Sequence, residues 1–73
     1  MMNSLEELIA SVLGISTELI TDNLAYDSIP TWDSLNHVNL MLALQENYGK
    51  EIDEDRMVEL TTVRAIREFV EAS

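Results

Sequence analysis

The chain has 73 residues, of which 47% are hydrophobic, and its 14 acidic and 4 basic residues give a net charge of −10. This acidity argues against binding nucleic acid or anionic membrane, whose phosphates need lysine and arginine, and favours basic surfaces of partner proteins. The absence of cysteine excludes a disulfide, a thiolate nucleophile and a cysteine-based metal site. We expect one domain over residues 1–73, with one small core, in a complete cytoplasmic protein without leader or membrane span.

Residues 3–13 are predicted to form the first helix, with Ser4 and Glu7 spaced as a capping box. Glu6 and Glu7 lie in the first turn, where the helix dipole favours negative charge. Gly14 follows at the position where a left-handed glycine commonly ends a helix. The apolar residues of the segment repeat at helical intervals and share one face: Leu5, Leu8, Ile9, Val12 and Leu13.

A long connection, residues 14–33, follows the first helix, which is unusual in so small a domain. Ser16, Thr17 and Glu18 predict a single helical turn within it. Apolar residues recur along the connection and are expected to pin it to the core: Ile15, Leu19, Ile20, Leu24 and Ile29.

The central helix is predicted to begin after Asp33, a favourable N-cap residue preceded by Pro30, and to end before Gly49. On a helical wheel its apolar side chains cover about 220°, wider than the stripe of an ordinary surface helix, so we expect several helices to contact it. These residues are Leu35, Val38, Leu40, Met41, Leu42, Leu44 and Tyr48. Ser34 projects into the middle of this arc, so a group attached to Ser34 would lie at the mouth of the seam between helices.

Two further helices complete the expected fold. Asp53 is predicted to cap a short helix over residues 54–59, with Met57 facing inward. Thr61 is predicted to cap the last helix, residues 62–72, whose apolar residues again share one face: Val63, Ile66, Phe69 and Val70. We therefore predict an all-α bundle of three main helices and one short one, with a long loop between the first two.

Ser34 and the single histidine, His37, lie three residues apart on the central helix, where a nucleophile and a base could meet. The sequence supplies neither an orienting third group nor an oxyanion site, so we interpret His37 as a partly buried packing residue. The acids Asp53, Glu54 and Asp55 lack the ligand spacing of a calcium loop and are interpreted as solvated charge. We expect no catalytic residue and no metal site.

The remaining role for Ser34 is that of an attachment point. A hydroxyl at a helix N-terminus is well placed to carry a phosphodiester, because unpaired N–H groups and the positive end of the dipole stabilise the phosphate. The charge of Asp33 opposes this effect slightly.

The chain resembles the acyl carrier protein family over nearly its whole length. The resemblance rests on the Asp33-Ser34-Leu35 string and on the positions that follow it without a gap: Val38, Leu40, Ala43, Leu44, Ile52, Leu60, Thr61, Thr62 and Val63. It implies that a phosphopantetheinyl transferase attaches 4′-phosphopantetheine from coenzyme A to Ser34, and that the thiol of this arm carries acyl groups as thioesters. It further implies a monomeric, non-catalytic carrier that serves an acyl-loading enzyme, a ketosynthase or an acyltransferase.

The resemblance also implies that the acyl chain is sheltered between helices. The candidate lining of this seam is Val38, Leu42, Ile52, Met57, Leu60 and Ile66. The candidate residues for partner recognition are Trp32, Asp33, Leu35, Asn39, Met41, Glu46 and Arg56. For Trp32 two placements are open, since it is either an exposed contact anchor or packed over the first helix or the loop.

Fatty-acid carriers usually have several acids on the helix after the serine, whereas Glu46 is the only acid on this helix. Amide side chains occupy much of it instead: Asn36, Asn39, Gln45 and Asn47. This difference weakens electrostatic steering and favours a specialised pathway, polyketide-like or of other secondary metabolism, over bulk fatty-acid synthesis.

Three alternatives remain open. Peptidyl carriers tend to have glycine before the serine, where this chain has Thr31 and Trp32, and D-alanyl carriers more often follow it with methionine, where this chain has Leu35. The third alternative, of another class, is an unmodified acidic helical adaptor that only binds proteins.

Overall fold

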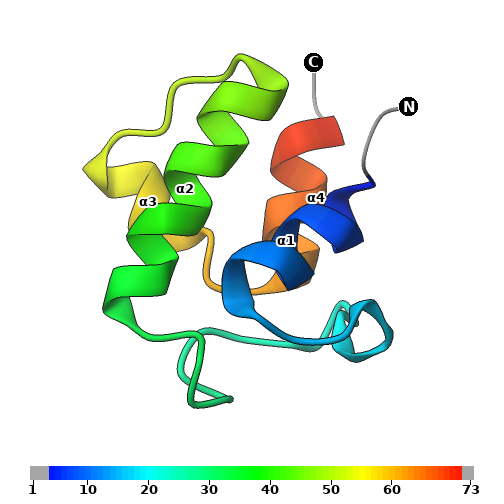
Figure 1. The fold of residues 1–73 in the computed structure, drawn as a ribbon. Coiled ribbons are helices and arrows are strands. Elements are labelled where there is room, and N and C mark those ends of the chain that lie inside the picture. The colour runs from blue at the N-terminus through cyan, green and yellow to red at the C-terminus, as the bar shows by residue number, and fades with distance from the viewer. Residues whose placement is uncertain (1–3, 72–73) are drawn as a thin grey trace.

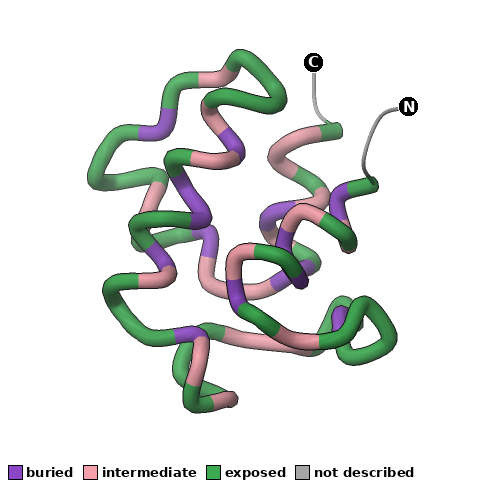
Figure 2. The backbone as a smooth tube through the Cα atoms, in the orientation of Figure 1, coloured by how far each residue is buried: buried purple, intermediate pink, exposed green. Residues whose placement is uncertain are grey.

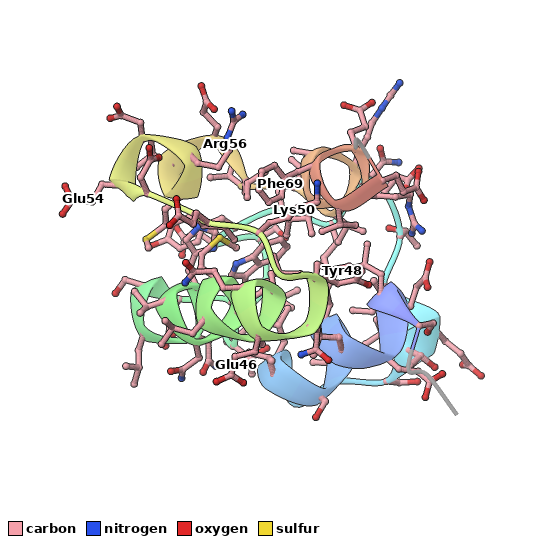
Figure 3. All side chains as sticks on the ribbon, turned by 90° about the horizontal axis from the view of Figure 1, so that it is seen from above. Glu46, Tyr48, Lys50, Glu54, Arg56 and Phe69 are labelled. Atoms are coloured by element: carbon pink, nitrogen blue, oxygen red, sulfur yellow. The ribbon has the colours of Figure 1, made fainter. Side chains whose placement is uncertain are left out.

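The computed structural model of the protein describes residues 4–71. Their elements are α1 (Leu5–Leu13), the 3₁₀ turn η1 (Thr17–Leu19), α2 (Ser34–Tyr48), α3 (Glu54–Glu59) and α4 (Val63–Glu71). The long connection between α1 and α2 runs across the end of the bundle at which α2 begins (Figure 1). Seen from above, α2 and α1 lie on one side, and α3 and α4 lie on the other (Figure 3). The predicted all-α fold is confirmed.

Local sequence signals set the ends of the helices. Ser4, Asp33 and Asp53 each accept a hydrogen bond from the main-chain N–H three residues later, at 3.1, 2.9 and 2.8 Å, and so cap α1, α2 and α3. Gly14 and Gly49 end α1 and α2 with φ of 69° and 64°, which glycine adopts without steric cost. These caps were predicted. Residue 3 of the predicted first helix and residue 72 of the predicted last helix lie outside the described residues.

The last helix begins one residue later than predicted. Its cap is Thr62, whose Oγ1 accepts a hydrogen bond from the N–H of Ala65 at 3.0 Å. The carbonyl oxygen of Thr61 instead accepts a hydrogen bond from the N–H of Tyr26 at 2.7 Å. This bond ties Thr61 to the long connection, and Thr62 takes the capping position.

Main-chain hydrogen bonds fasten the long connection to the start of α4. Ala25 and Thr62 form an isolated antiparallel bridge, and the N–H of Val63 donates to the carbonyl oxygen of Leu24 at 3.0 Å. The predicted helical turn is confirmed as η1, which Ser16 caps. These bonds explain how so long a loop keeps one course.

The core is built from α1, α2, α4 and the connecting segments. Its buried apolar residues are Leu5, Ile9, Ala10, Leu13, Ile20, Trp32, Leu40, Met41, Leu44, Ile52, Leu60, Val63 and Ile66. Ile15, Leu24, Ile29, Met57, Phe69 and Val70 pack against this core while partly buried, as predicted. Leu19 is 57% exposed, so the prediction that it pins the loop is wrong.

The other helices cover only part of the apolar arc of α2. The arc residues that are buried are Leu40, Met41 and Leu44. Those that are exposed are Leu35, Val38, Leu42 and Tyr48. Buried and exposed positions alternate along α2 (Figure 2), because its neighbours leave its outer side uncovered. The other helices are too few and too short to surround α2, so the exposed part of its apolar arc faces solvent.

An ionic cluster joins α1, the long connection and α4. The Arg67 guanidinium contacts Glu6 Oε2 at 2.6 Å and Asp22 Oδ1 at 3.2 Å. A hydrogen bond from a main-chain N–H, followed by the Arg67 guanidinium, lowers the pKa of Glu6 below its usual value of 4.5. The hydrogen bond to Glu6 in turn raises the pKa of Arg67.

The lowered pKa of Glu6 makes its contribution to stability depend on pH. The contribution is complete above the pKa of the unfolded chain and is lost as the pH falls through the lower pKa of the folded state. We expect Glu6→Gln to lower the free energy of unfolding by about 0.5 kcal/mol near neutral pH, and by a smaller amount at a pH below 4.5, where Glu6 begins to be protonated. Urea titration followed by circular dichroism measures both values. Glu68→Gln is the matched control, since the pair of Glu68 and Arg64 is more exposed, and an equal loss from it would contradict the prediction.

Candidate attachment site

Ser34 is the first residue of α2 and is exposed. Asp33 has extended backbone, and its side chain accepts a hydrogen bond from the N–H of Asn36. The first N–H groups of a helix have no partner within the helix, and the positive end of its dipole lies there. The Ser34 hydroxyl is therefore accessible to an enzyme, at a position that stabilises an attached phosphate.

A hollow of about 370 Å³, here called the Ser34 hollow, opens beside this serine. It lies between the start of α2, α3 and the long connection, and its walls are Tyr26, Ser34, His37, Val38, Met57, Val58 and Thr61. Carbon atoms of Val38, Met57 and Val58 make up much of this surface, so it suits an apolar chain better than a charged one.

Trp32 and His37 connect the segments around this hollow. The Trp32 indole Nε1–H donates a hydrogen bond to His37 Nδ1 at 3.0 Å, and His37 Nε2 lies 2.9 Å from the carbonyl oxygen of Met57. An indole N–H can only donate and a carbonyl can only accept, so this pattern requires a neutral ring with its proton on Nε2. His37 is buried, and it links the residue two before Ser34 to α3. The prediction that His37 packs inside the fold is confirmed.

Two of the residues predicted to recognise partners lie in the core. Trp32 and Met41 are 0% exposed, so neither side chain contacts a partner on this surface, and both assignments are corrected. Of the two placements considered for Trp32, packing against the loop is the one observed, with main-chain hydrogen bonds to Asp27 and Ile29. Burial removes its large apolar area from water while His37 satisfies its one polar hydrogen.

The other candidates for partner recognition are exposed. Asp33, Leu35, Asn39 and Glu46 lie on α2 or at its cap, and Glu46 points away from α3 and α4 (Figure 3). Arg56 lies on α3, where it pairs with Glu59 at 2.9 Å. Together with Lys50 it approaches the ring of Phe69, each 5.4 Å from the ring centroid, at a separate hollow of about 550 Å³ (Figure 3).

The predicted acyl seam is divided by the structure. Val38 and Met57 line the Ser34 hollow, whereas Ile52, Leu60 and Ile66 are buried in the core. Leu42 is 53% exposed on the outer side of α2 and does not belong to the seam. Three further residues that line the hollow could not be predicted from the sequence, because they come from loops and from the exposed side of α3: Tyr26, Val58 and Thr61.

These features define a helical domain that presents an accessible serine beside an apolar hollow. Over residues 3–70 the chain matches the family described as a phosphopantetheine attachment site. The chain belongs to this family. It is a non-catalytic carrier protein with covalent 4′-phosphopantetheine, and its family implies a phosphopantetheinyl transferase and acyl-handling enzymes as partners.

The exposed hydroxyl of Ser34 and the adjoining hollow fit a covalently attached arm. Among residues 4–71, no helix is long and apolar enough to cross a membrane. The monomeric state and the cytoplasmic location stay predictions.

The burial of Trp32 predicts a large effect on stability. We expect Trp32→Ala to lower the free energy of unfolding by about 3–5 kcal/mol, since it leaves a cavity in the core and an unpaired imidazole nitrogen. Chemical denaturation followed by circular dichroism measures the change. Leu35→Ala, at a position that is 70% exposed, serves as the control and should change stability by less than about 0.5 kcal/mol. A Trp32→Ala protein as stable as this control would contradict the placement of Trp32 in the core.

Proposed function

We propose that the protein is an acyl carrier whose 4′-phosphopantetheine arm is attached to Ser34. The observation that carries this proposal is the exposed hydroxyl on the first turn of α2, at the rim of an apolar hollow. The hydroxyls of Ser4, Ser16 and Ser28 accept hydrogen bonds from main-chain N–H groups in their own turns. Ser11 lies within α1, away from any helix start. Ser34 therefore has an exposed hydroxyl and lies at the N-terminus of a helix.

The character of the hollow supports an acyl cargo over an aminoacyl one. The thiol of the arm holds the cargo as a thioester, and Val38, Met57 and Val58 offer the cargo a carbon-rich surface. The ammonium group of an aminoacyl cargo would lose hydration there without gaining a partner, which is costly. Mass spectrometry of the group carried by the protein from its native host distinguishes these cargoes.

The outer face of α2 supports a specialised pathway in place of bulk fatty-acid synthesis. The exposed apolar side chains of Leu35, Val38 and Leu42 lie on this helix, together with the exposed amide of Asn39. Glu46 is the one acid in α2. A partner that binds this face gains affinity from apolar contact more than from ion pairs, so we infer that its loading enzyme, ketosynthase or acyltransferase presents a weakly charged surface.

Attachment at Ser34 is tested with coenzyme A, a broad-specificity phosphopantetheinyl transferase and intact-mass measurement. We expect the wild-type chain to gain the mass of one phosphopantetheinyl group and Ser34→Ala to gain none, because the other serines among residues 4–71 are bonded in their own turns or lie within α1. Ser11→Ala is the matched control and should be modified like the wild type. Circular dichroism verifies that both variants remain helical.

A wild-type chain that gains no mass would favour the unmodified adaptor. Modification of Ser34→Ala would place the arm on another residue.

The apolar docking face is tested by truncating Leu42. We expect Leu42→Ala to slow acyl transfer from the cognate loading enzyme by about fivefold or more, as for truncation of a central contact in an interface. Leu19→Ala is the matched control, because Leu19 is exposed to a similar extent, 57% against 53%, but lies in η1.

Transfer rates should also change little with ionic strength, since few charges lie on the docking face. A steep loss of rate with added salt, without an effect of Leu42→Ala, would contradict apolar docking.

A further inference from the structure

We propose that Asn36 is a positioning residue for Ser34. Its side-chain amide ties the first turn of α2 to the loop before the helix, and so sets the direction in which the Ser34 hydroxyl faces a phosphopantetheinyl transferase. This role rests on attachment of the arm at Ser34, and it adds a residue that governs the rate of attachment. Asn36 acts through Ser34 and does not itself react.

Two hydrogen bonds that end on Asn36 enclose Ser34. The Nδ2–H of Asn36 donates to the carbonyl oxygen of Thr31 at 2.7 Å, and its main-chain N–H donates to Asp33 Oδ1 at 2.9 Å. A main-chain carbonyl only accepts hydrogen bonds, so the amide presents its NH₂ group to Thr31. Asn36 therefore holds both the loop three residues before Ser34 and the residue directly before it.

Thr31 depends on this bond for its place in the loop. Its hydroxyl oxygen is buried, yet this atom has no hydrogen-bond partner among residues 4–71. The partly buried bond from Asn36 is the polar contact that the structure gives to Thr31 in this part of the chain. A carbonyl that loses its partner there must recover water or move, because an unpaired buried polar group is costly. Loss of the Asn36 amide is therefore expected to shift the main chain at Thr31.

The buried side chain of Trp32 anchors the loop, but it does not by itself fix the direction of Ser34. The main chain of each residue keeps two soft dihedral angles, so a rotation at Asp33 would turn the serine while the indole stayed in the core. The bonds of Asn36 restrict this rotation from both sides, at the Thr31 carbonyl and at the Asp33 cap. The amide thus links the anchored loop to the start of the helix.

The direction of the serine matters because attachment is a displacement at phosphorus. The Ser34 oxygen forms a bond to the phosphorus of coenzyme A that bears pantetheine, and the bond from this phosphorus to the bridging oxygen breaks. Adenosine 3′,5′-bisphosphate leaves, and the serine proton passes to a base of the transferase. The attacking and leaving oxygens lie roughly in line in such reactions, and catalysis depends mainly on positioning. A misdirected serine therefore lowers the rate without weakening the complex.

A different role for Asn36 would be direct contact with a partner, since amide side chains occupy much of α2. Both ends of its amide, however, are bonded within the chain: Nδ2 to Thr31, and Oδ1 to Asn39 Nδ2 at 3.4 Å. The two roles differ in what a substitution changes. Loss of a contact weakens the complex with the transferase, whereas loss of positioning lowers the maximal rate.

The test uses the full chain, coenzyme A and a phosphopantetheinyl transferase in excess, so that each carrier molecule is modified once. Intact mass gives the maximal rate at saturating transferase and the transferase concentration at half of that rate, for the wild type and Asn36→Asp. Aspartate has nearly the shape of asparagine and is favoured in the first turn of a helix, but its carboxylate cannot donate to the Thr31 carbonyl. We expect the maximal rate to fall about fivefold or more, the effect of losing one hydrogen bond, and the half-saturating concentration not to rise.

Asn47→Asp is the matched control. Asn47 Nδ2 donates to the carbonyl oxygen of Ala43 at 2.8 Å, so this variant loses the same kind of bond and gains the same charge on the same helix, away from Ser34. It should be modified at the maximal rate of the wild type. Asn36→Ala removes the amide without adding charge and should show the same fall as Asn36→Asp. Circular dichroism verifies that each variant is helical.

An unchanged maximal rate in Asn36→Asp and Asn36→Ala, or an equal fall in Asn47→Asp, would overturn the positioning role. A raised half-saturating concentration with an unchanged maximal rate would assign Asn36 to partner contact instead. Loss of helical structure in both Asn36 variants would also overturn the role, since Asn36 would then support the fold as a whole. A wild-type chain that gains no mass would overturn attachment itself, and that outcome is distinguishable because no variant then differs from the wild type.

Discussion

The hydrogen bond between the buried indole of Trp32 and the imidazole of His37 is the contact on which the geometry of the site depends. It spans the point where the chain changes from loop to helix, since Trp32 precedes the cap of α2 and His37 lies one turn inside it. An indole in the core fixes where the loop ends, because an unpaired N–H there would be costly. The imidazole of His37 also hydrogen-bonds to the Met57 carbonyl, so the position of α3 is tied to the same contact. Ser34, between the two residues, remains exposed while its surroundings are fixed.

The long connection has a structural role that its length alone does not suggest. Two main-chain hydrogen bonds, from the N–H of Tyr26 to the carbonyl oxygen of Thr61 and from the N–H of Val63 to that of Leu24, hold it against the start of α4. This brings Tyr26 to the Ser34 hollow, opposite side chains of α3. The hollow is thus formed by segments that lie far apart in the sequence, around a serine whose own position is set locally.

The acidic residues of the chain lie mainly outside α2. The chain has a net charge of −10, yet α2 carries a single acid, and that acid points away from α3 and α4. The acids gather at other places, among them the first turns of α1 and α3. The exposed side of α2, by contrast, presents mainly apolar and amide side chains, so it contributes little charge to the steering of a partner. Membership of the phosphopantetheine attachment family is consistent with such a carrier.

Short-range signals in the sequence determined most helix ends and the candidate serine. Ser4, Asp33 and Asp53 as caps, together with Gly14 and Gly49 as ends, act within a few residues, so these five helix boundaries could be predicted without knowledge of the fold. The same holds for Ser34, because an N-cap places the next residue at a helix start in any context. The start of α4 could not be predicted in this way, because a hydrogen bond from the long connection holds Thr61.

The tertiary structure alone decided which apolar residues are covered. Trp32 is buried and Leu42 is exposed, although Trp32 follows Pro30 and Thr31 in a loop and Leu42 lies in an apolar run, because the course of the loop and the packing of the other helices select which side chains are covered. The Ser34 hollow and the bonds of His37 to Trp32 and Met57 are decided in the same way. They join segments whose approach depends on the packing of the whole chain, which periodicity along one helix does not encode.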